Sequence, residues 1–273
     1  MQVRVRWSDE IQKIKLERKS IVVFVDVLRT ASTLCYGLDS NASSLIITKD
    51  INNALALKEN DPKTTLIAGE RGGIQLDGFD VGNSPYLISQ KLKKSKKKKK
   101  LVLCTGNFSS VIGNMYSSKA VTYVIGCLAN AKSLAAYIAR KKPSYLYIVP
   151  VGTYYMTNYK GKLPVYTEED LVGSLYILTE LMKIRKDLEL EERELEHLAQ
   201  FDAVLRNQKK LSQFLQHTLY AESLKSQDKT LGNKKGRIKN INQKDMEFCF
   251  RCNKLTIIPK LYKEKGLYLI KRR

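Results

Sequence analysis

Histidine and tryptophan are scarce in the 273-residue sequence, which has two histidines and one tryptophan. Both histidines, His197 and His217, fall in polar segments with a helical pattern, far from the end of any predicted strand. We therefore expect them on the solvated surface. Their placement argues against catalysis through a covalent histidine intermediate.

The sequence also lacks the features of a secreted or membrane-spanning protein. Residues 1–7 have no apolar core like that of a signal peptide, and the most apolar stretch, 120–139, is interrupted by polar residues. The five cysteines are odd in number and scattered, which predicts free thiols in a reducing cytoplasm. Cys249 and Cys252 form a lone CxxC pair without a second pair at zinc spacing, so buried thiols are favoured over a metal site.

Acidic residues are outnumbered, because 48 Lys and Arg against 27 Asp and Glu give a net charge of +21. Such an excess attracts the phosphates of nucleic acids, membranes or small ligands. Eight lysines lie in residues 91–100, where like charges repel one another and favour a solvated loop over an RNA-binding stripe. No zinc-finger or RNA-binding signature accompanies them, so a nucleic-acid-binding protein is the alternative interpretation.

Short apolar runs alternate with helical segments in the first part of the chain. Helices are expected at 52–58, 109–116 and 131–141. The alternation predicts a single α/β domain over 1–273, a layered α/β/α sandwich with a largely parallel or mixed sheet. The predicted strands are Ile21–Val25, Leu45–Thr48, Thr65–Ala68, Leu101–Cys104, Thr122–Ile125 and Tyr145–Val149.

The C-terminal half has a different pattern. Leucines at helical spacing predict a long helical excursion over 166–225, and polar, basic composition predicts a loop over 226–245. Apolar runs at Leu255–Ile258 and Leu267–Ile270 predict a final pair of strands.

Polar residues follow the first predicted strand, at the end where parallel sheets bind ligands. They are Asp26, Arg29, Thr30 and Ser32, and they lie where a helix is expected to begin. A carboxylate, a guanidinium and hydroxyls at a helix N-terminus can hold a metal ion and a phosphate together.

Acidic and basic residues recur after the third predicted strand. Glu70 and Arg71 are followed by two glycines, and Asn83 and Ser84 come soon after. Glu70 can coordinate a hard cation, and Arg71 can bind two oxygens of one anion. The alternative is a surface turn that carries an ion pair.

Two later segments are ambiguous when each is taken alone. Thr105 and Asn107 follow the fourth strand, where N-capping of a helix is a simpler account than an anion-binding nest. Glu169 and Asp170, preceded by Glu168, begin a helix, where they either complement its dipole or bind a metal.

Several phosphatase mechanisms are excluded by missing motifs. Asp26 lacks the second aspartate of the haloacid dehalogenase signature, no cysteine is followed by arginine six positions later, and no GxxxxGK[ST] loop is present. Metal-assisted hydrolysis remains, with carboxylates on the metal and arginines on the anion. Mg²⁺ is favoured over zinc because the candidate ligands are all oxygens.

Taken together, these segments resemble the 2-phosphosulfolactate phosphatase family over most of the chain. The likeness rests on residues 25–33, 68–72, 78–85, 125–131 and 169–170, and the closing segments 245–249 and 257–259 are similar too. One block departs from the family pattern. Where the family usually has Thr-Thr-Asn-Gly-Thr, this chain has Cys104-Thr105-Gly106-Asn107-Phe108.

The resemblance implies a Mg²⁺-dependent phosphomonoesterase that converts 2-phospho-3-sulfolactate and water to 3-sulfolactate and phosphate, on a route to coenzyme M. A related phosphatase with another small phospho-acid substrate is the alternative within enzymes. A homodimer is one of the assemblies that the sequence allows. The implied site has metal ligands from Asp26, Glu70, Glu169 and Asp170, anion-binding Arg29 and Arg71, and pocket residues Thr30, Ser32, Asn83, Ser84, Thr105 and Asn107.

Overall fold

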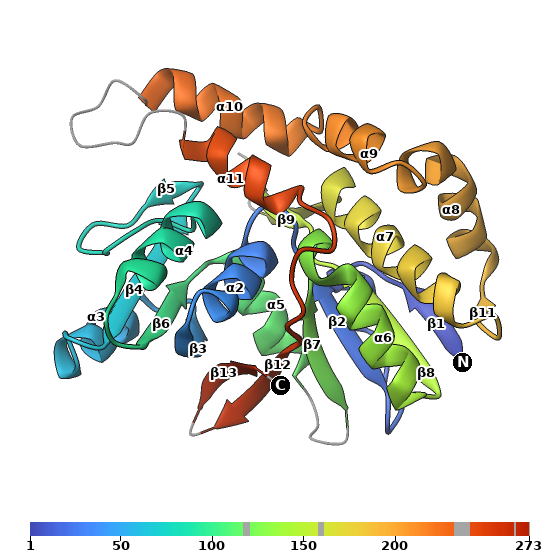
Figure 1. Cartoon of the computed structure of the whole chain (residues 1–273), viewed down its shortest axis with the longest axis horizontal. Helices are drawn as coiled ribbons and strands as arrows, with labels where there is room; N and C mark the ends of the chain where they lie inside the picture. Colours follow the sequence, from blue (N-terminus) through green and yellow to red (C-terminus); the bar gives the residue numbers. More distant parts are fainter. Residues whose placement is uncertain (117–120, 158–160, 232–240, 265, 273) are drawn as a thin grey trace.

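A computed structural model of the chain describes residues 1–116, 121–157, 161–231, 241–264 and 266–272. Within them, eleven strands form one mixed sheet with helices on its faces, which confirms the predicted α/β fold (Figure 1). The strands of this sheet are β1 (Gln2–Val5), β2 (Ile21–Val25), β3 (Ala42–Thr48), β4 (Thr65–Arg71), β5 (Ile74–Gln75), β6 (Lys99–Cys104), β7 (Thr122–Gly126), β8 (Tyr145–Pro150), β11 (Glu189–Leu190), β12 (Pro259–Glu264) and β13 (Leu267–Arg272). A separate antiparallel pair consists of β9 (Thr153–Thr157) and β10 (Gly161–Val165).

The helices divide between those that connect the strands and a helical run in the C-terminal half. The connecting helices are α1 (Ser8–Ile11), α2 (Thr30–Asp39), α3 (Ile51–Asn60), α4 (Pro85–Lys94), α5 (Asn107–Met115) and α6 (Ala131–Lys141). The C-terminal run consists of α7 (Glu168–Ile184), α8 (Glu192–Leu205), α9 (Gln208–Leu215), α10 (Leu219–Leu231) and α11 (Ile241–Cys249). In Figure 1, α8 to α11 form an arc across one end of the molecule.

The sheet contains two blocks of parallel strands. Its order is β11-β1-β8-β2-β7-β12-β13-β3-β6-β4-β5. The strands from β11 to β7 are parallel to their neighbours, and so are β3, β6 and β4. The antiparallel hairpin of β12 and β13 pairs with β7 on one side and β3 on the other, so the last strands of the chain join the two blocks.

Both faces of β2 are buried, which explains its unbroken run of apolar residues. Val23 and Val25 pack with residues of α6 and α7 in one cluster. Val22 and Phe24 pack on the opposite face in a second cluster, which also contains apolar residues of β3, β6, α2, α4 and α5. Because both strand blocks contribute to this second cluster, they are held around shared helices, and the ends of their strands come together.

Three predicted segment boundaries are wrong. Residues 91–94 are not part of a loop, because the apolar spacing of Ile88 and Leu92 continues α4 to Lys94; β6 then begins at Lys99. The expected loop over 226–245 overlaps α10 and α11, and its residues 232–240 lie outside the described part.

The third wrong boundary concerns the run Leu255–Ile258, which is not a strand, although the final pair of strands exists. The backbone N–H of Leu255 donates to the carbonyl of Ala129, and Asn130 donates from its side chain to the carbonyl of Ile257. The run is therefore bonded to the turn before α6, and strand β12 starts only at Pro259.

All five cysteines are free and buried, which confirms the predicted free thiols and the predicted burial of Cys249 and Cys252. Among the residues that the structure describes, no helix is both long enough and apolar enough to cross a membrane.

Candidate active site

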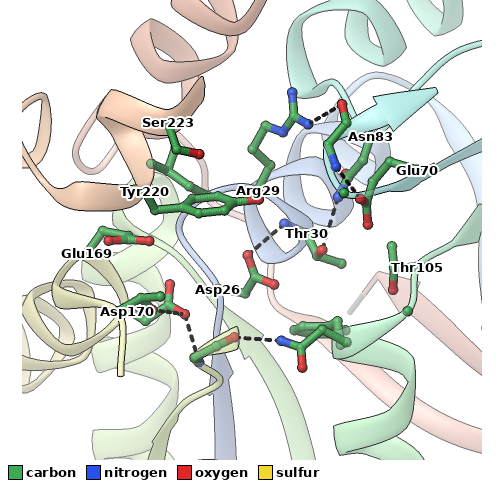
Figure 2. A pocket seen from close by; sticks show the side chains of 18 of the residues that line it. Asp26, Arg29, Thr30, Glu70, Asn83, Thr105, Glu169, Asp170, Tyr220 and Ser223 are labelled. Atoms are coloured by element: carbon green, nitrogen blue, oxygen red, sulfur yellow. Dashed lines mark hydrogen bonds between the residues drawn. The ribbon is translucent and has the colours of Figure 1, made fainter. Parts of the chain in front are cut away.

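A cavity of about 390 Å³ lies at the carboxyl ends of β2, β4, β6 and β8, where the parallel strands of both blocks end (Figure 2). Most of the predicted site residues line it, although they come from segments far apart in the sequence. These residues are Asp26, Arg29, Thr30, Glu70, Arg71, Asn83, Thr105, Asn107, Glu169 and Asp170.

Two predicted residues, Ser32 and Ser84, do not line the cavity. The hydroxyl of Ser32 donates to the carbonyl of Val27 at 2.8 Å, so it closes the turn that begins α2. Ser84 is the N-cap of α4 and accepts a hydrogen bond from the backbone N–H of Leu87. Both hydroxyls therefore shape the backbone near the cavity instead of contacting a ligand.

Asp26 lies at the centre of the cavity in Figure 2, directly after β2. Its Oδ1 accepts a hydrogen bond of 2.9 Å from the backbone N–H of Thr30, at the start of α2. Burial raises the pKa of Asp26 to about 6, and the nearby Glu70 carboxylate adds to the increase. The carboxylate thus lies where a positive charge would strongly stabilise its ionised form.

Asp170 holds several backbone segments together at the start of α7. Its Oδ1 accepts from the N–H of Val27 at 2.8 Å, and its Oδ2 accepts from the N–H of Gly152 and the hydroxyl of Thr167, both at 3.0 Å. These bonds tie the ends of β2 and β8 to α7. Each oxygen of Asp170 already accepts a hydrogen bond from the protein. Its position therefore favours a structural role, in addition to any contact with a ligand.

Glu169 is the carboxylate of α7 that is freer to act on a ligand. Its side chain lies opposite Asp26 in Figure 2, and only 2% of the residue is exposed. Burial raises the pKa of Glu169 to about 7, and the charge of Asp26 contributes to the increase. Two buried carboxylates that disfavour each other's ionisation are a suitable place for a cation.

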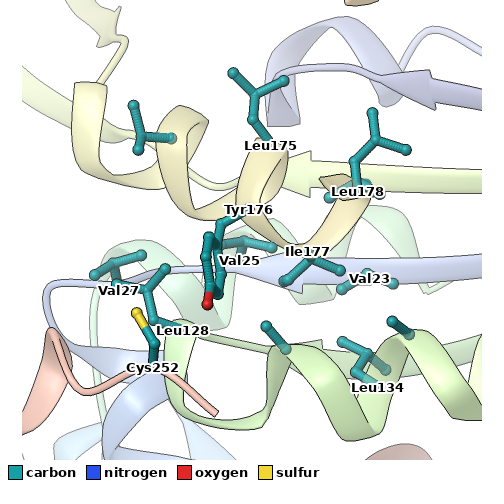
Figure 3. Packing of buried hydrophobic residues seen from close by; sticks show 14 of the residues in the cluster. Val23, Val25, Val27, Leu128, Leu134, Leu175, Tyr176, Ile177, Leu178 and Cys252 are labelled. Carbon is teal, nitrogen blue, oxygen red and sulfur yellow. The ribbon is translucent and has the colours of Figure 1, made fainter. Parts of the chain in front are cut away.

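A glycine allows α7 to bring these carboxylates close to β2. A Cβ added at Gly173 would lie 2.6 Å from Cγ2 of Val27 and 3.3 Å from Cγ1 of Val25. Figure 3 shows α7 packed directly over this end of β2, with Val25 and Val27 beneath the helix. Any larger residue at position 173 would move the helix that carries Glu169 and Asp170.

Arg29 is held by the C-terminal helix α11. Its Nη1 donates to Oδ1 of Asn242 at 2.7 Å and to Oδ2 of Asp245 at 3.0 Å, and its Nη2 donates to the carbonyl of Gly73 at 3.4 Å. Burial lowers the pKa of Arg29, but the acidic groups around it, Asp245 first and Glu70 among the others, together outweigh burial and the net change is an increase. Sequence reasoning assigned no role to Asn242 or Asp245, because both are distant in the chain from Arg29.

Glu70 and Arg71 lie at the end of β4. Figure 2 shows Glu70 across the cavity from Glu169 and Asp170 of α7. Oε2 of Glu70 accepts from the N–H of Gly73 at 2.8 Å. Arg71 donates to the carbonyls of Glu70 and Lys49, both at 2.7 Å. Among the described residues no carboxylate pairs with Arg71, so its charge remains available to an anion.

The turn that departs from the family pattern forms the start of α5 at the cavity wall. Phe108 is buried at the base of this wall, where its ring packs edge-on against Phe24 with centroids 6.2 Å apart. Asn107 donates from Nδ2 to the carbonyl of Gly152 at 2.6 Å. The Oδ1 atoms of Asn107 and Asn83 are buried and have no hydrogen-bond partner among the described residues, which suits a polar ligand.

Helix α10 supplies three cavity residues that sequence reasoning missed: Tyr220, Ser223 and Gln227. Their spacing of three and four positions places them on one helical face, and this polar stripe was the available signal. Gln227 donates from Nε2 to the carbonyl of Gly72 at 3.3 Å, so α10 is tied to the turn after β4.

Comparisons with known proteins match the chain to one family. The model of a family described as 2-phosphosulpholactate phosphatase matches residues 6–264. A probable 2-phosphosulfolactate phosphatase of Clostridium tetani is 29% identical over 194 residues, covering 71% of the chain and 75% of that relative. One of Carboxydothermus hydrogenoformans is 26% identical over 260 residues, covering 95% and 93%. One of Caldicellulosiruptor saccharolyticus is 34% identical over 140 residues, covering 50% and 55%.

Proposed function

The chain belongs to the 2-phosphosulpholactate phosphatase family, and on that premise we propose that its cavity hydrolyses the phosphate ester of 2-phosphosulfolactate. The observation that carries the proposal is the meeting of acidic and guanidinium side chains from distant segments in one cavity. Asp26, Glu70, Arg71 and Glu169 line it together. Phosphoester hydrolysis needs such a combination, since positive charge must stabilise the transferring group.

The donor chemistry of the cavity fits Mg²⁺, which we propose as the cofactor. Asp26 and Glu169 are buried carboxylates with raised pKa values, and both would be stabilised by a cation. Among the described residues no three His, Cys, Asp or Glu side chains are grouped closely enough to hold a metal by themselves. The predicted set of four carboxylate ligands is therefore not assembled among these residues. Mg²⁺ can be held by one or two carboxylates together with waters and substrate oxygens, so Asp26 and Glu169 would be its ligands. When bound, the ion would polarise the phosphate and acidify a water molecule.

The protein's own residues would bind and orient the phosphate. Arg71 offers guanidinium N–H groups, and the start of α5 offers free backbone N–H groups with the positive end of its dipole. Thr30 and Thr105 add hydroxyls to the same wall. Asp170 keeps the ends of β2 and β8 in place, so that these donors face one point.

Replacing Asp26 by asparagine tests the proposal. The change keeps the shape of the side chain and removes its charge, so Mg²⁺-dependent phosphate release from 2-phosphosulfolactate should fall by more than about a hundredfold. Asp202→Asn, an exposed change on α8, is the matched control and should leave release unchanged. Phosphate release would be measured with and without Mg²⁺, and circular dichroism would show that both variants are folded. Full activity of Asp26→Asn would refute its assignment as a ligand.

A cytoplasmic location is part of the same proposal. Five buried free thiols are expected of a protein from a reducing compartment.

A further inference from the structure

The elements around the cavity contribute different chemistry. Asp26, Glu70 and Glu169 bring carboxylates from β2, β4 and α7, whereas α10 presents Tyr220 and Ser223 (Figure 2). All the described α10 side chains that line the cavity are neutral, and each carries a hydrogen-bond donor.

Lys225, the lysine of α10 whose side chain the structure describes, is bonded away from the cavity. Nζ of Lys225 donates to Oε1 of Glu222 at 2.8 Å and to the carbonyl of Gln216 at 2.5 Å. In a chain with 48 Lys and Arg, the absence of a described lysine from this wall is therefore a local property of α10. The α10 side chains themselves offer an anion hydrogen bonds, and the guanidinium of Arg29, whose charge acts on Tyr220, supplies positive charge nearby.

The stripe is held rigidly enough to recognise a ligand. The opposite face of α10 is anchored in the core by Ala221 and Leu224, both fully buried. The carbonyl of Leu224 accepts from Nδ2 of Asn242 at 3.0 Å, which ties α10 to α11. Gln227 contacts the turn after β4, where a Cβ added at Gly73 would lie 2.6 Å from its Oε1. Tyr220 and Ser223 are thus held between two fixed points.

From this arrangement we propose that Tyr220 and Ser223 form the subsite for the sulfonate of the substrate, with Gln227 holding the helix that carries them. The inference rests on the proposed function. A phosphate dianion binds metal ions and arginine strongly, so it belongs beside the carboxylates and Arg71. A sulfonate is the conjugate base of a strong acid and a weak metal ligand, and it accepts hydrogen bonds from neutral hydroxyls. The more basic phosphate is therefore expected beside the carboxylates and Arg71, and the less basic sulfonate beside Tyr220 and Ser223.

The test compares two substrates that differ only in this group: 2-phosphosulfolactate and 2-phospholactate, whose methyl group replaces the sulfonated carbon. Tyr220→Phe and Ser223→Ala each remove one hydroxyl. With Mg²⁺ present, each variant should lose about tenfold or more in kcat/KM for 2-phosphosulfolactate, chiefly through KM. The value for 2-phospholactate should change by less than about threefold, because no hydrogen bond is lost.

Matched controls remove the same atoms elsewhere. Tyr262→Phe, on β12, and Ser226→Ala, on the exposed side of α10, should change neither substrate. Equal losses for both substrates would overturn the inference, because the stripe would then hold a part that they share, such as the carboxylate. Unchanged selectivity in Tyr220→Phe and Ser223→Ala would overturn it as well.

A binding measurement separates this inference from the proposed function. Calorimetry with 3-sulfolactate and with lactate requires no turnover. If the protein releases phosphate from neither substrate yet binds 3-sulfolactate, and Tyr220→Phe weakens only that binding, the proposed function fails and the subsite stands. If phosphate is released but the preference for the sulfonate is unaffected by the variants, the function stands and the subsite fails. Absence of both release and binding refutes both.

Discussion

Replacing Asp245 by alanine should lower the free energy of unfolding by about 3–5 kcal/mol, because it leaves a buried guanidinium without its partner. The side chains of Asp245 and Arg29 are 0% and 5% exposed. Asp245 also accepts hydrogen bonds from the hydroxyl of Ser84 at 2.5 Å and the N–H of Tyr86 at 3.2 Å. The alanine variant therefore leaves three donors unsatisfied at once.

Urea unfolding followed by circular dichroism, with linear extrapolation to water, would measure the change. Asp202→Ala is the matched control, since Asp202 pairs with Arg206 on the surface, where the side chains are 52% and 76% exposed. An exposed pair of this kind contributes little to stability, so the control should unfold almost as the native chain does. Asp245→Asn keeps an acceptor oxygen and should fall between the two.

A second variant isolates the ion pair. In the double variant Arg29→Met with Asp245→Ala, no charge is left buried, so part of the lost stability should return relative to Asp245→Ala alone. If Asp245→Ala costs less than about 1 kcal/mol, or if the double variant is simply additive, the pair does not anchor α11 over the cavity and the reasoning is wrong.

Three further predictions concern the site and its surroundings. Gly173→Ala should cost about 1–3 kcal/mol in urea unfolding and lower kcat, because the new Cβ forces α7 away from Val27; native stability and activity would contradict the close approach. Treatment with EDTA should abolish phosphate release and added Mg²⁺ should restore it, whereas release that survives exhaustive chelation would exclude the proposed cofactor. Replacing Lys96–Lys100 by alanine should leave kcat unchanged and weaken the salt dependence of kcat/KM. If the unchanged chain instead binds RNA firmly at moderate salt and the alanine variant does not, a nucleic-acid partner is favoured.

Strands buried on both faces were the most predictable part of the fold. The run Ile21–Val25 matches β2 residue for residue, since an unbroken apolar segment of this length has one good solution in a parallel sheet. The segment Leu255–Ile258 is also mostly apolar, yet its backbone bonds with the turn before α6. Local pattern indicates that a segment is buried, but the partner that satisfies its backbone is chosen by the tertiary structure.

The residues of the site also divide into those that the sequence could predict and those that only the structure reveals. Asp26, Glu70 and Arg71 were found because they directly follow strands, and parallel sheets place such positions at one edge. Tyr220 and Asp245 follow no strand, and their roles depend on how α10 and α11 cross the cavity. Such packing between distant helices leaves no short motif, so only the structure reveals these contributions.

The whole chain has a large net positive charge, whereas acidic side chains outnumber basic ones in the cavity. A net charge of +21 draws anions toward the surface, and salt screens this attraction over about 10 Å at 0.1 M. Within the cavity, four carboxylates face two guanidiniums, and Asp245 neutralises one of those. A substrate with several negative charges would be repelled there unless a cation were also bound. The overall charge thus accounts for attraction to the surface, and the proposed Mg²⁺ would let the acidic side chains of the cavity take part in binding.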